Sequence, residues 1–487
     1  MKKRIAIIIT SLIIASVSLQ VSSVSFDNFI SYRYDSWNEP VRTPDAYFVK
    51  QVVSGTSAGI DAFLTPTDMF VTTDDELYIL DPGKNRVVVL DNTYKFTRQI
   101  TGFTDNGSEY FLSKDASGIY VDEEGYIFIA DTGNKIVLVC DDEGEIVHKF
   151  VKPNSPLYPQ EVDFKPSKVL TDSSGNTYVL VSGLYYGAIV YNPDGNFQTF
   201  FGTNNVTVTA RVLADYFWKK IMTDEQKKQL GRYVPIAYTN MYIDRKNFIY
   251  TCTDNSLRKL NPGGKEVLRK GSNLFFGDYY TVWDHGKPIN TIFTDLVVES
   301  NGIVSMLDSA RGKIFQYGPE SDLLYAFGGS SNQLGTFKDP SAIEAMNGDL
   351  LVLDSKNADI TVFEPTAFAM KVRMGSDLYN TGKYENSLEL WGEVLKADAN
   401  YELAYTGLGK AQFNLGEFDK AMVSFRLGED RMNYSLAKKE YRSILLQKYF
   451  GLIGTVMILL IIFAAAMINL SSIKNSKLIK KWRRKNV

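Results

Sequence analysis

Histidine and cysteine are almost absent from this chain of 487 residues, which contains two of each. A metal site built on three imidazoles is therefore excluded, because His148 and His285 are the only histidines. Cys140 and Cys252 show no CxxC spacing and lie in separate predicted strands, so we expect two buried free thiols, with a disulfide between them as the alternative. The net charge of −3 gives no whole-chain argument for nucleic-acid binding.

Hydrophobic residues make up 45% of the chain, which places it among globular proteins, and its length allows two or three domains. The first residues, MKKR, precede an apolar run of about fifteen residues, which is typical of a secretory signal peptide. Ser23 and Ser25 fit a cleavage site before Phe26. Residues 1–25 are therefore predicted to be a signal peptide, with an uncleaved anchor helix as the alternative.

A second apolar segment lies near the C-terminus. Residues 449–473 carry no charge and exceed the roughly 20 apolar residues that cross a bilayer. The tail that follows, residues 474–487, is rich in lysine and arginine and contains no acid, as expected of a segment held in the cytoplasm. We therefore predict a single-pass protein of the cell membrane, with its N-terminal domains extracytoplasmic and its C-terminus cytoplasmic.

A strand–turn–strand pattern recurs six times within residues 45–365. Two copies are ELYILDPGKNRVVVLD (76–91) and YIFIADTGNKIVLVCD (126–141), and the others begin near residues 176, 247, 302 and 349. Each copy follows another short strand and a tight turn such as Asp-Glu-Glu-Gly, in which glycine supplies the positive φ. Sheets of four short strands bury both faces when they pack radially, so we predict an all-β six-bladed propeller. The last copy lacks a fourth strand, which residues 45–53 are expected to supply.

The repeats resemble those of the NHL family, in which a strand ends in Asp and is followed by a Gly-Asn turn, a basic residue and a second strand. Asp131, Gly133, Asn134 and Lys135 match this pattern, whereas the copies near residues 176 and 247 depart from it. The resemblance covers residues 45–365 and implies the fold rather than a function. We interpret the Asp and Asn of each turn as structural.

An insertion of residues 203–236 separates the third unit from the fourth. Its segment ARVLADYFWKKIM (210–222) has apolar residues at helical spacing, so we expect a helical hairpin. The hairpin is interpreted either as a lid over the channel mouth or as a packing element. Its candidate binding residues are Tyr216 and Trp218.

Residues 371–448 repeat a helical pattern in which Gly375 and Trp391 match Gly409 and Phe425. Small residues that let helices approach, with aromatics between them, resemble tetratricopeptide (TPR) repeats. The resemblance implies an α-helical module that is either a partner-binding solenoid or a rigid stalk, followed by the single C-terminal transmembrane helix. The candidate binding residues in its groove are Tyr379, Tyr405 and Phe413.

Catalytic patterns are weak in this sequence. We recognise no Ser-His-Asp set, phosphate loop or paired carboxylates, so no catalytic residue, metal ligand or cofactor is predicted and enzymatic activity is not favoured. Gluconolactonases, which are propellers of similar size, hold a divalent ion over the axis, but their opening Glu-Gly-Pro has no counterpart in TPTDMFV (65–71). Asp68 and Asp295 could face the channel, where we expect them to be polar lining rather than ligands.

The whole architecture resembles membrane-anchored NHL-repeat proteins of Gram-positive bacteria, which accompany components of sugar-importing ABC transporters. This resemblance implies an extracytoplasmic binding or scaffold protein whose propeller and TPR module bind a protein partner or an oligosaccharide beside a permease. The alternative is a propeller hydrolase of the gluconolactonase type with a divalent metal. Nucleic acid is not an expected partner.

Overall fold

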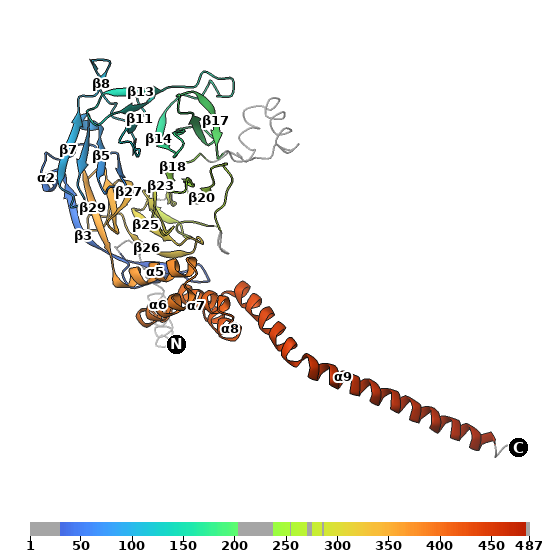
Figure 1. The fold of residues 1–487 in the computed structure, drawn as a ribbon. Coiled ribbons are helices and arrows are strands. Elements are labelled where there is room, and N and C mark those ends of the chain that lie inside the picture. The colour runs from blue at the N-terminus through green and yellow to red at the C-terminus, as the bar shows by residue number, and fades with distance from the viewer. Residues whose placement is uncertain (1–29, 203–236, 254, 270–274, 285–286, 484–487) are drawn as a thin grey trace, which may run out of the picture. The chain divides into compact units, whose positions relative to one another are not determined.

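The computed structural model describes residues 30–202, 237–253, 255–269, 275–284 and 287–483. The chain divides into two compact units between Arg373 and Met374. The first unit is a ring of β-sheets and the second is helical (Figure 1). The predicted signal peptide (1–25) and the predicted insertion (203–236) lie outside the described residues.

The ring consists of six antiparallel sheets, as predicted, and each sheet is one blade of a propeller. Their innermost strands adjoin one another in chain order, and the sixth returns to the first. Blade 1 contains β4 (Asp68–Val71), β5 (Leu77–Asp81), β6 (Arg86–Leu90) and β7 (Phe96–Thr101); blade 2 contains β10 (Gly118–Val121), β11 (Ile127–Asp131), β12 (Ile136–Cys140) and β13 (Ile146–Phe150). Blade 3 contains β14 (Pro166–Thr171), β15 (Thr177–Val181), β16 (Ala188–Tyr191) and β17 (Phe197–Phe201); blade 4 contains β18 (Asn240–Ile243), β19 (Ile249–Thr253) and β20 (Ser256–Leu260). Blade 5 contains β23 (Phe293–Val298), β24 (Val304–Asp308), β25 (Lys313–Tyr317) and β26 (Leu323–Gly328); blade 6 contains β27 (Pro340–Met346), β28 (Asp349–Asp354), β29 (Asp359–Pro365) and β3 (Tyr47–Ser54).

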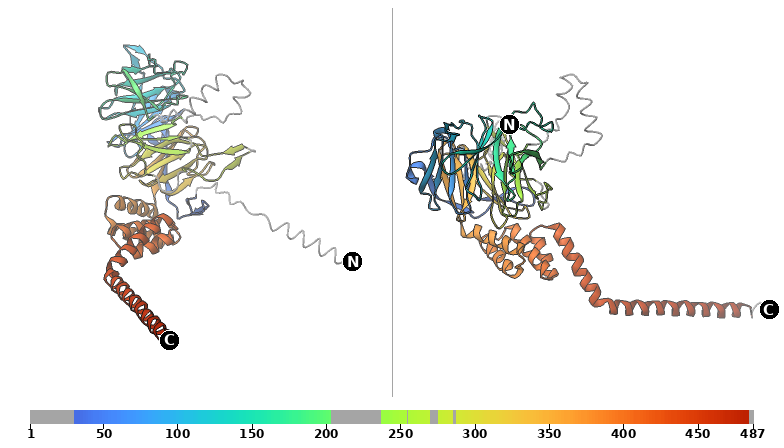
Figure 2. Two further views of the ribbon diagram at one scale, coloured as in Figure 1. Left: turned by 90° about the vertical axis from the view of Figure 1, so that its right-hand side faces the viewer. Right: turned by 45° about the horizontal axis from the view of Figure 1, so that its top comes forward.

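Strand β3 closes the ring. It precedes blade 1 in the sequence but pairs antiparallel with β29, from Ser54↔Asp359 to Tyr47↔Pro365. The prediction that residues 45–53 complete the last blade is therefore confirmed. A buried cluster that includes Val53, Ile79 and Val362 joins the first and last blades into one core. Shorter elements are α2 (Gly55–Ala58), η1 (Pro82–Lys84), β8 (Thr104–Asp105), β9 (Ser108–Glu109) and the hairpin β21–β22 (Val282–Asp284 and Lys287–Ile289), which projects from the ring in yellow-green in the left view of Figure 2.

Two short strands ahead of the predicted propeller extend blade 5. Strand β1 (Tyr32–Tyr34) pairs with β26 at Tyr32↔Ala326, and β2 (Pro40–Arg42) pairs with β1. The hydroxyls of Tyr32 and Tyr34 donate to one oxygen of the buried Asp278, at 2.5 and 2.6 Å. Its other oxygen accepts from Arg311 at 2.5 Å and Lys313 at 3.0 Å. Burial opposes the charge of Asp278, but Lys313, the two hydroxyls and Arg311 hold its pKa below the usual value.

The turn aspartates are structural, as predicted. Asp81 lies at the end of β5 and accepts from the backbone N–H groups of Leu64, at 3.1 Å, and Thr65, at 3.0 Å, in the loop that enters its blade. Asp354 accepts in the same way from the backbone N–H of Lys338 at 2.7 Å. These carboxylates give partners to backbone donors that lie outside the strand ladders. Asp131 and Asp308 play the same part for the loops that enter blades 2 and 5.

The helical unit begins within α5 and continues to the C-terminus. Its helices are α5 (Ala367–Asn380), α6 (Tyr384–Ala397), α7 (Glu402–Asn414), α8 (Phe418–Leu427) and α9 (Arg431–Arg483). Within α9, Arg431–Ser472 is long and apolar enough to cross a membrane, as predicted for its C-terminal part, and no other helix among the described residues is. The predicted contacts between small and aromatic residues occur, since Gly375 and Gly407 approach Trp391 and Gly409 approaches Phe425.

Two glycines of this unit give a matched test of that packing. A Cβ on Gly407 would lie 2.5 Å from the Trp391 ring, so we expect Gly407→Ala to destabilise the unit by about 1–2 kcal/mol through overpacking. A Cβ on Gly392, in α6, would meet no atom within 4 Å. Gly392→Ala should therefore stabilise the unit by up to about 1 kcal/mol through helix propensity. Helical circular dichroism of the detergent-solubilised chain measures the midpoint of unfolding. This midpoint should fall in Gly407→Ala and rise in Gly392→Ala, and a shift of the same sign in both variants would contradict the packing.

Candidate functional site

The innermost strand of each blade has one equivalent position. Its residue pairs with the last residue but one of the second strand of the same blade. Asp68, for example, pairs with Leu80, which precedes Asp81. Because these strands surround the axis, side chains at this position can meet there. In chain order the six residues are Asp68, Gly118, Lys168, Asn240, Asp295 and Ala342.

Asp68 joins the first three blades at the axis. One carboxylate oxygen accepts from the Lys168 ammonium in blade 3 at 2.6 Å. The other accepts from the backbone N–H of Ile119 in blade 2 at 2.9 Å. We call this set the first clamp. Burial opposes the charge of Lys168, but the carboxylates of Asp68, Asp295 and Glu344 hold its pKa above the usual value.

Asp295 joins the other three blades in the same manner. One oxygen accepts from the Asn240 amide in blade 4 and from the backbone N–H of Leu296 at 2.9 Å, while the other accepts from the backbone N–H of Ile343 in blade 6 at 2.7 Å. We call this set the second clamp. Burial raises the pKa of Asp295 to about 7, and the charge of Asp68 adds to this effect against the attraction of Lys168.

Glu344, on β27 of blade 6, adds a third buried carboxyl to the axis, where 8% of the residue is exposed. Burial, then Asp295 and then Asp68 raise its pKa well above the usual value. Among the described residues, the axis thus holds three buried carboxyl groups and the Lys168 ammonium. Asp68 and Asp295 face the channel, as the sequence suggested, and each is bonded to neighbouring blades.

The metal-binding capacity of this layer follows from its geometry. Among the residues that the structure describes, no three His, Cys, Asp or Glu side chains lie close enough together to hold a metal ion. The Lys168 ammonium already pairs with Asp68 at 2.6 Å. Cys140 and Cys252 are buried free thiols, as predicted, and burial raises the pKa of each to about 12, so neither is a ready nucleophile.

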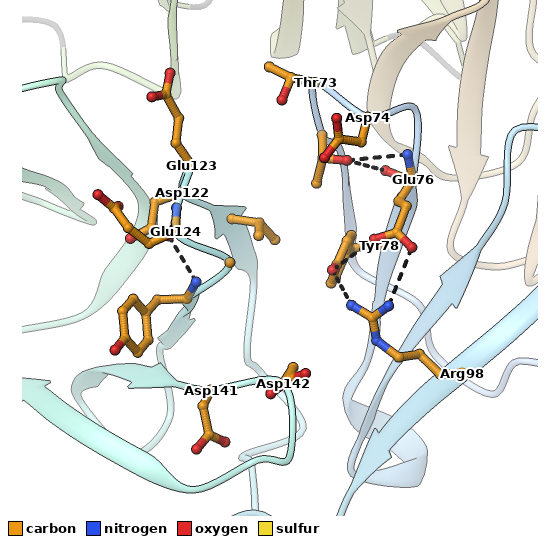
Figure 3. A pocket seen from close by; sticks show the side chains of 14 residues that line it. Thr73, Asp74, Glu76, Tyr78, Arg98, Asp122, Glu123, Glu124, Asp141 and Asp142 are labelled. Carbon is orange, nitrogen blue, oxygen red and sulfur yellow. Dashed lines mark hydrogen bonds and ion pairs between the residues drawn. The ribbon is translucent and has the colours of Figure 1, made fainter.

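A second candidate site is an acidic hollow of about 500 Å³ at one end of blades 1 and 2. Among the described residues that line it, Arg98 is the one cation, and it donates to Glu76 at 3.3 Å and to the Tyr78 hydroxyl at 2.5 Å (Figure 3). Burial raises the pKa of Asp122. Seven carboxylates around one hollow favour a cationic ligand group. The acidic lining residues are Asp74, Glu76, Asp122, Glu123, Glu124, Asp141 and Asp142.

The residues predicted for binding in the helical unit are half-buried and contribute to its packing. Tyr379 contacts the ring of Tyr384 at a centroid distance of 5.6 Å, and the Tyr405 hydroxyl donates to the carbonyl of Ala399 at 3.1 Å. Phe413 packs against the buried cluster of α8 and α9. The structure therefore gives each of them a packing contact, and their role in binding stays a prediction. Tyr216 and Trp218 lie outside the described residues.

The axial residues Lys168, Asn240 and Glu344 were missed, although a signal for the first two exists. When the six first strands are aligned on their turns, Asp68, Lys168, Asn240 and Asp295 fall in one column of otherwise apolar strands. Opposite charges in a buried column predict an ion pair across the axis. The acidic hollow had a similar signal, because the turns TTDDE, DEEG and DDEG lie on two successive blades.

Together the ring and its axis define the first unit as a six-bladed β-propeller. No protein-family model matches the chain, and no curated protein matches it. Solved structures with similar folds include a gluconolactonase from Xanthomonas campestris, at 10% identity and TM-score 0.41, covering 70% of this chain and 95% of that one. A virginiamycin B lyase from Staphylococcus aureus has 10% identity and TM-score 0.38, covering 61% and 80%. At such identity the similarity is one of fold and carries no conclusion about activity.

Proposed function

We propose that this chain is a membrane-anchored binding protein that holds a partner protein, or an oligosaccharide, on the extracytoplasmic side of the membrane. Helix α9 supplies the anchor, and the basic tail favours a cytoplasmic C-terminus. The propeller and the helical unit, which we assign to the NHL and TPR types on their repeat patterns, supply the binding surfaces. Components of a sugar-importing ABC transporter are the partners we propose.

The observation that supports this proposal most directly is the distribution of polar groups in the propeller. The axial carboxylates of both clamps are bonded to neighbouring blades, as expected of a structural layer. The carboxylates of the acidic hollow instead line a cavity at the end of two blades. Exposed apolar side chains stand on the loops that enter the blades, among them Phe111 and Leu334 at 61% and 67% exposure. The acidic hollow suits binding of a cationic partner group.

Affinity capture of the detergent-solubilised full chain from its own membranes tests the proposal. We expect permease subunits or a solute-binding protein to be recovered and identified by mass spectrometry. If the partner places cationic groups in the acidic hollow, Glu124→Lys should reduce recovery severalfold. The control is Glu143→Lys, which makes the same change in another turn of blade 2. Glu143 does not line the hollow, so this variant should leave recovery unchanged. Failure to recover any specific protein or oligosaccharide would contradict the proposed function.

A hydrolase of the gluconolactonase type is the second candidate. One observation favours it, because carboxyl groups whose pKa values are raised, such as Asp295 and Glu344, are typical of acid–base sites. Metal analysis of the purified chain and a screen for lactone hydrolysis test this candidate. Stoichiometric divalent metal together with turnover would replace the binding proposal with this one.

A further inference from the structure

We propose that helix α9 binds anionic lipid headgroups just outside the membrane through Lys438, Lys439 and Arg442, which we call the basic stripe. These side chains precede the apolar run of residues 449–473 on the same helix. Binding of this kind rests on the membrane anchor of the proposed function, because the stripe needs a bilayer beside it. It does not depend on which partner the propeller or the helical unit holds.

Positive charge in the helical unit is concentrated next to the apolar run. The part of the unit ahead of α9, residues 374–430, contains ten acids and five bases. The first turns of α9, residues 431–448, contain five bases and a single acid, Glu440. The unit is therefore acidic over its first helices and becomes basic where the chain approaches the membrane.

The basic stripe lies on a face of α9 that does not pack against α8. Ala437 is fully buried in the cluster that α9 shares with Phe425 of α8. At 3.6 residues per turn, Lys438, Arg442 and Lys439 lie within about 100° of one another around the helix, and Ala437 lies about 100° beyond Lys438 on the other side. All three basic side chains are exposed, and within the described part of the chain no carboxylate forms an ion pair with them.

The distance from the stripe to the membrane follows from the rise of the helix. Because α9 is one helix, the backbone of Arg442 lies about 10 Å, and that of Lys438 about 16 Å, along the helix from Tyr449, where the apolar run begins. Headgroups fill about 5–8 Å of this distance, so the stripe lies within about one Debye length of them. Figure 1 shows a bend in α9 beside its label, which brings the first turns still closer to a membrane that the later turns cross.

Lys448 and Tyr449 mark the level of the membrane surface on α9. The Lys448 ammonium lies 5.6 Å from the centroid of the Tyr449 ring, and 44% of Tyr449 is exposed. Tyrosine is enriched at membrane–water interfaces, and a lysine near the end of a span extends its ammonium toward the headgroups. Lys448 thus adds a fourth cation to the stripe, and four bases so close to a span are typical of segments that bind anionic lipids.

Membrane orientation alone does not account for these bases. Lysine and arginine beside a span favour the cytoplasmic side, and the tail of residues 474–487 already supplies seven of them for that purpose. Bases ahead of the span oppose the orientation that the tail favours. Anionic headgroups of the outer leaflet would neutralise the stripe where it lies. The acidic helices of a second copy are the other source of negative charge, and the experiment separates the two.

Reconstitution of the full chain into bilayer nanodiscs, one chain in each, tests the binding of headgroups. The discs contain phosphatidylcholine, with phosphatidylglycerol added in steps up to half of the lipid. A dye sensitive to its surroundings is attached at Ser443→Cys, because Ser443 is exposed beside the stripe whereas Cys140 and Cys252 are buried. We expect its emission to shift to shorter wavelength as phosphatidylglycerol increases. Salt at roughly 1 M should reverse the shift, because it shortens the Debye length to about 3 Å.

Replacing all three residues of the basic stripe with glutamine should abolish the shift. Each cation near a charged membrane surface strengthens binding by about fivefold, so the triple change should weaken it by up to about a hundredfold. A matched control removes two lysines and one arginine from exposed positions elsewhere in the helical unit and should keep the shift. The control changes are Lys383→Gln, Lys396→Gln and Arg426→Gln.

The outcomes distinguish the stripe from the anchor. An emission that is the same with and without phosphatidylglycerol, or a shift that survives the triple change, would overturn the binding of headgroups and leave the proposed function intact. A shift that needs two chains in one disc and no anionic lipid would assign the stripe to a second copy and would overturn it as well. A chain that does not enter the bilayer would contradict the anchor itself, and with it both proposals.

Discussion

Replacing Asp278 with asparagine is expected to destabilise the propeller by about 3–5 kcal/mol, the cost of breaking a buried ion pair from one side. Arg311 and Lys313 have side chains only 5% exposed, and both bind the same carboxylate oxygen. Without that charge, the two buried cations lose the carboxylate that they share. The hydroxyls of Tyr32 and Tyr34 lose a charged acceptor at the same time, so strand β1 should detach first. Urea unfolding of the solubilised chain, with limited proteolysis ahead of residue 45, measures both effects.

The control for this prediction is an exposed ion pair in the same unit. Lys135 and Asp163 lie 3.2 Å apart with side chains 50% and 62% exposed, so Lys135→Met should change the stability little. Because the native pKa of Asp278 lies below its usual value, the stability it contributes is present above the unfolded pKa and is lost only as pH falls through the native value. The difference between wild type and Asp278→Asn should therefore be constant near neutral pH; comparable losses in both variants would refute the argument.

The blades could be predicted because each one satisfies a local rule. A run such as YIFIAD alternates with glycine-containing turns, and the turn Asp131 has both a sequence signature and a fixed hydrogen-bonding task. Closure by β3 also followed from counting, since the last unit of the sequence lacks a fourth strand and residues 45–53 offer a spare one. The strands and turns of each blade depend on residues close together in the chain, where periodicity and turn chemistry are informative.

Other features depend on distant residues and left little local trace. Strands β1 and β2 have three residues each, too few to establish a period, and they are held by Asp278 from a loop about 245 positions away. The two clamps arise because one register position recurs in six blades. The aligned column shows this position, but only the closed ring shows which blades its side chains join. Glu344 is two residues beyond that position, so even the aligned column of Asp68 and Lys168 does not reveal it.

Replacing Arg373 with methionine is the second change expected to cost about 3–5 kcal/mol. Arg373, in the first half of α5, forms an ion pair with Glu299 in a turn of blade 5 and donates to the Tyr47 hydroxyl at 3.0 Å. Both side chains are less than 15% exposed, and burial already raises the pKa of Glu299 despite Arg373. Without Arg373, the carboxylate of Glu299 would be buried and unpaired, and it becomes neutral only by binding a proton. The loss of stability should therefore increase as pH rises above the unfolded value of a glutamic acid, which a series of thermal unfolding curves from pH 5 to pH 8 can measure.

A double variant shows whether the loss comes from leaving Glu299 unpaired or from removing an ion pair that stabilises the fold. Removing both charges, in Arg373→Met with Glu299→Leu, leaves no uncompensated ion, and Tyr47 still accepts from Gln316 at 2.9 Å. Buried ion pairs often break even against apolar packing, so we expect the double variant to recover most of the stability and all of the added pH dependence. Recovery would assign the pair to fixing where α5 joins the propeller rather than to net stabilisation. A double variant as unstable as Arg373→Met would instead show that the ion pair itself stabilises this junction.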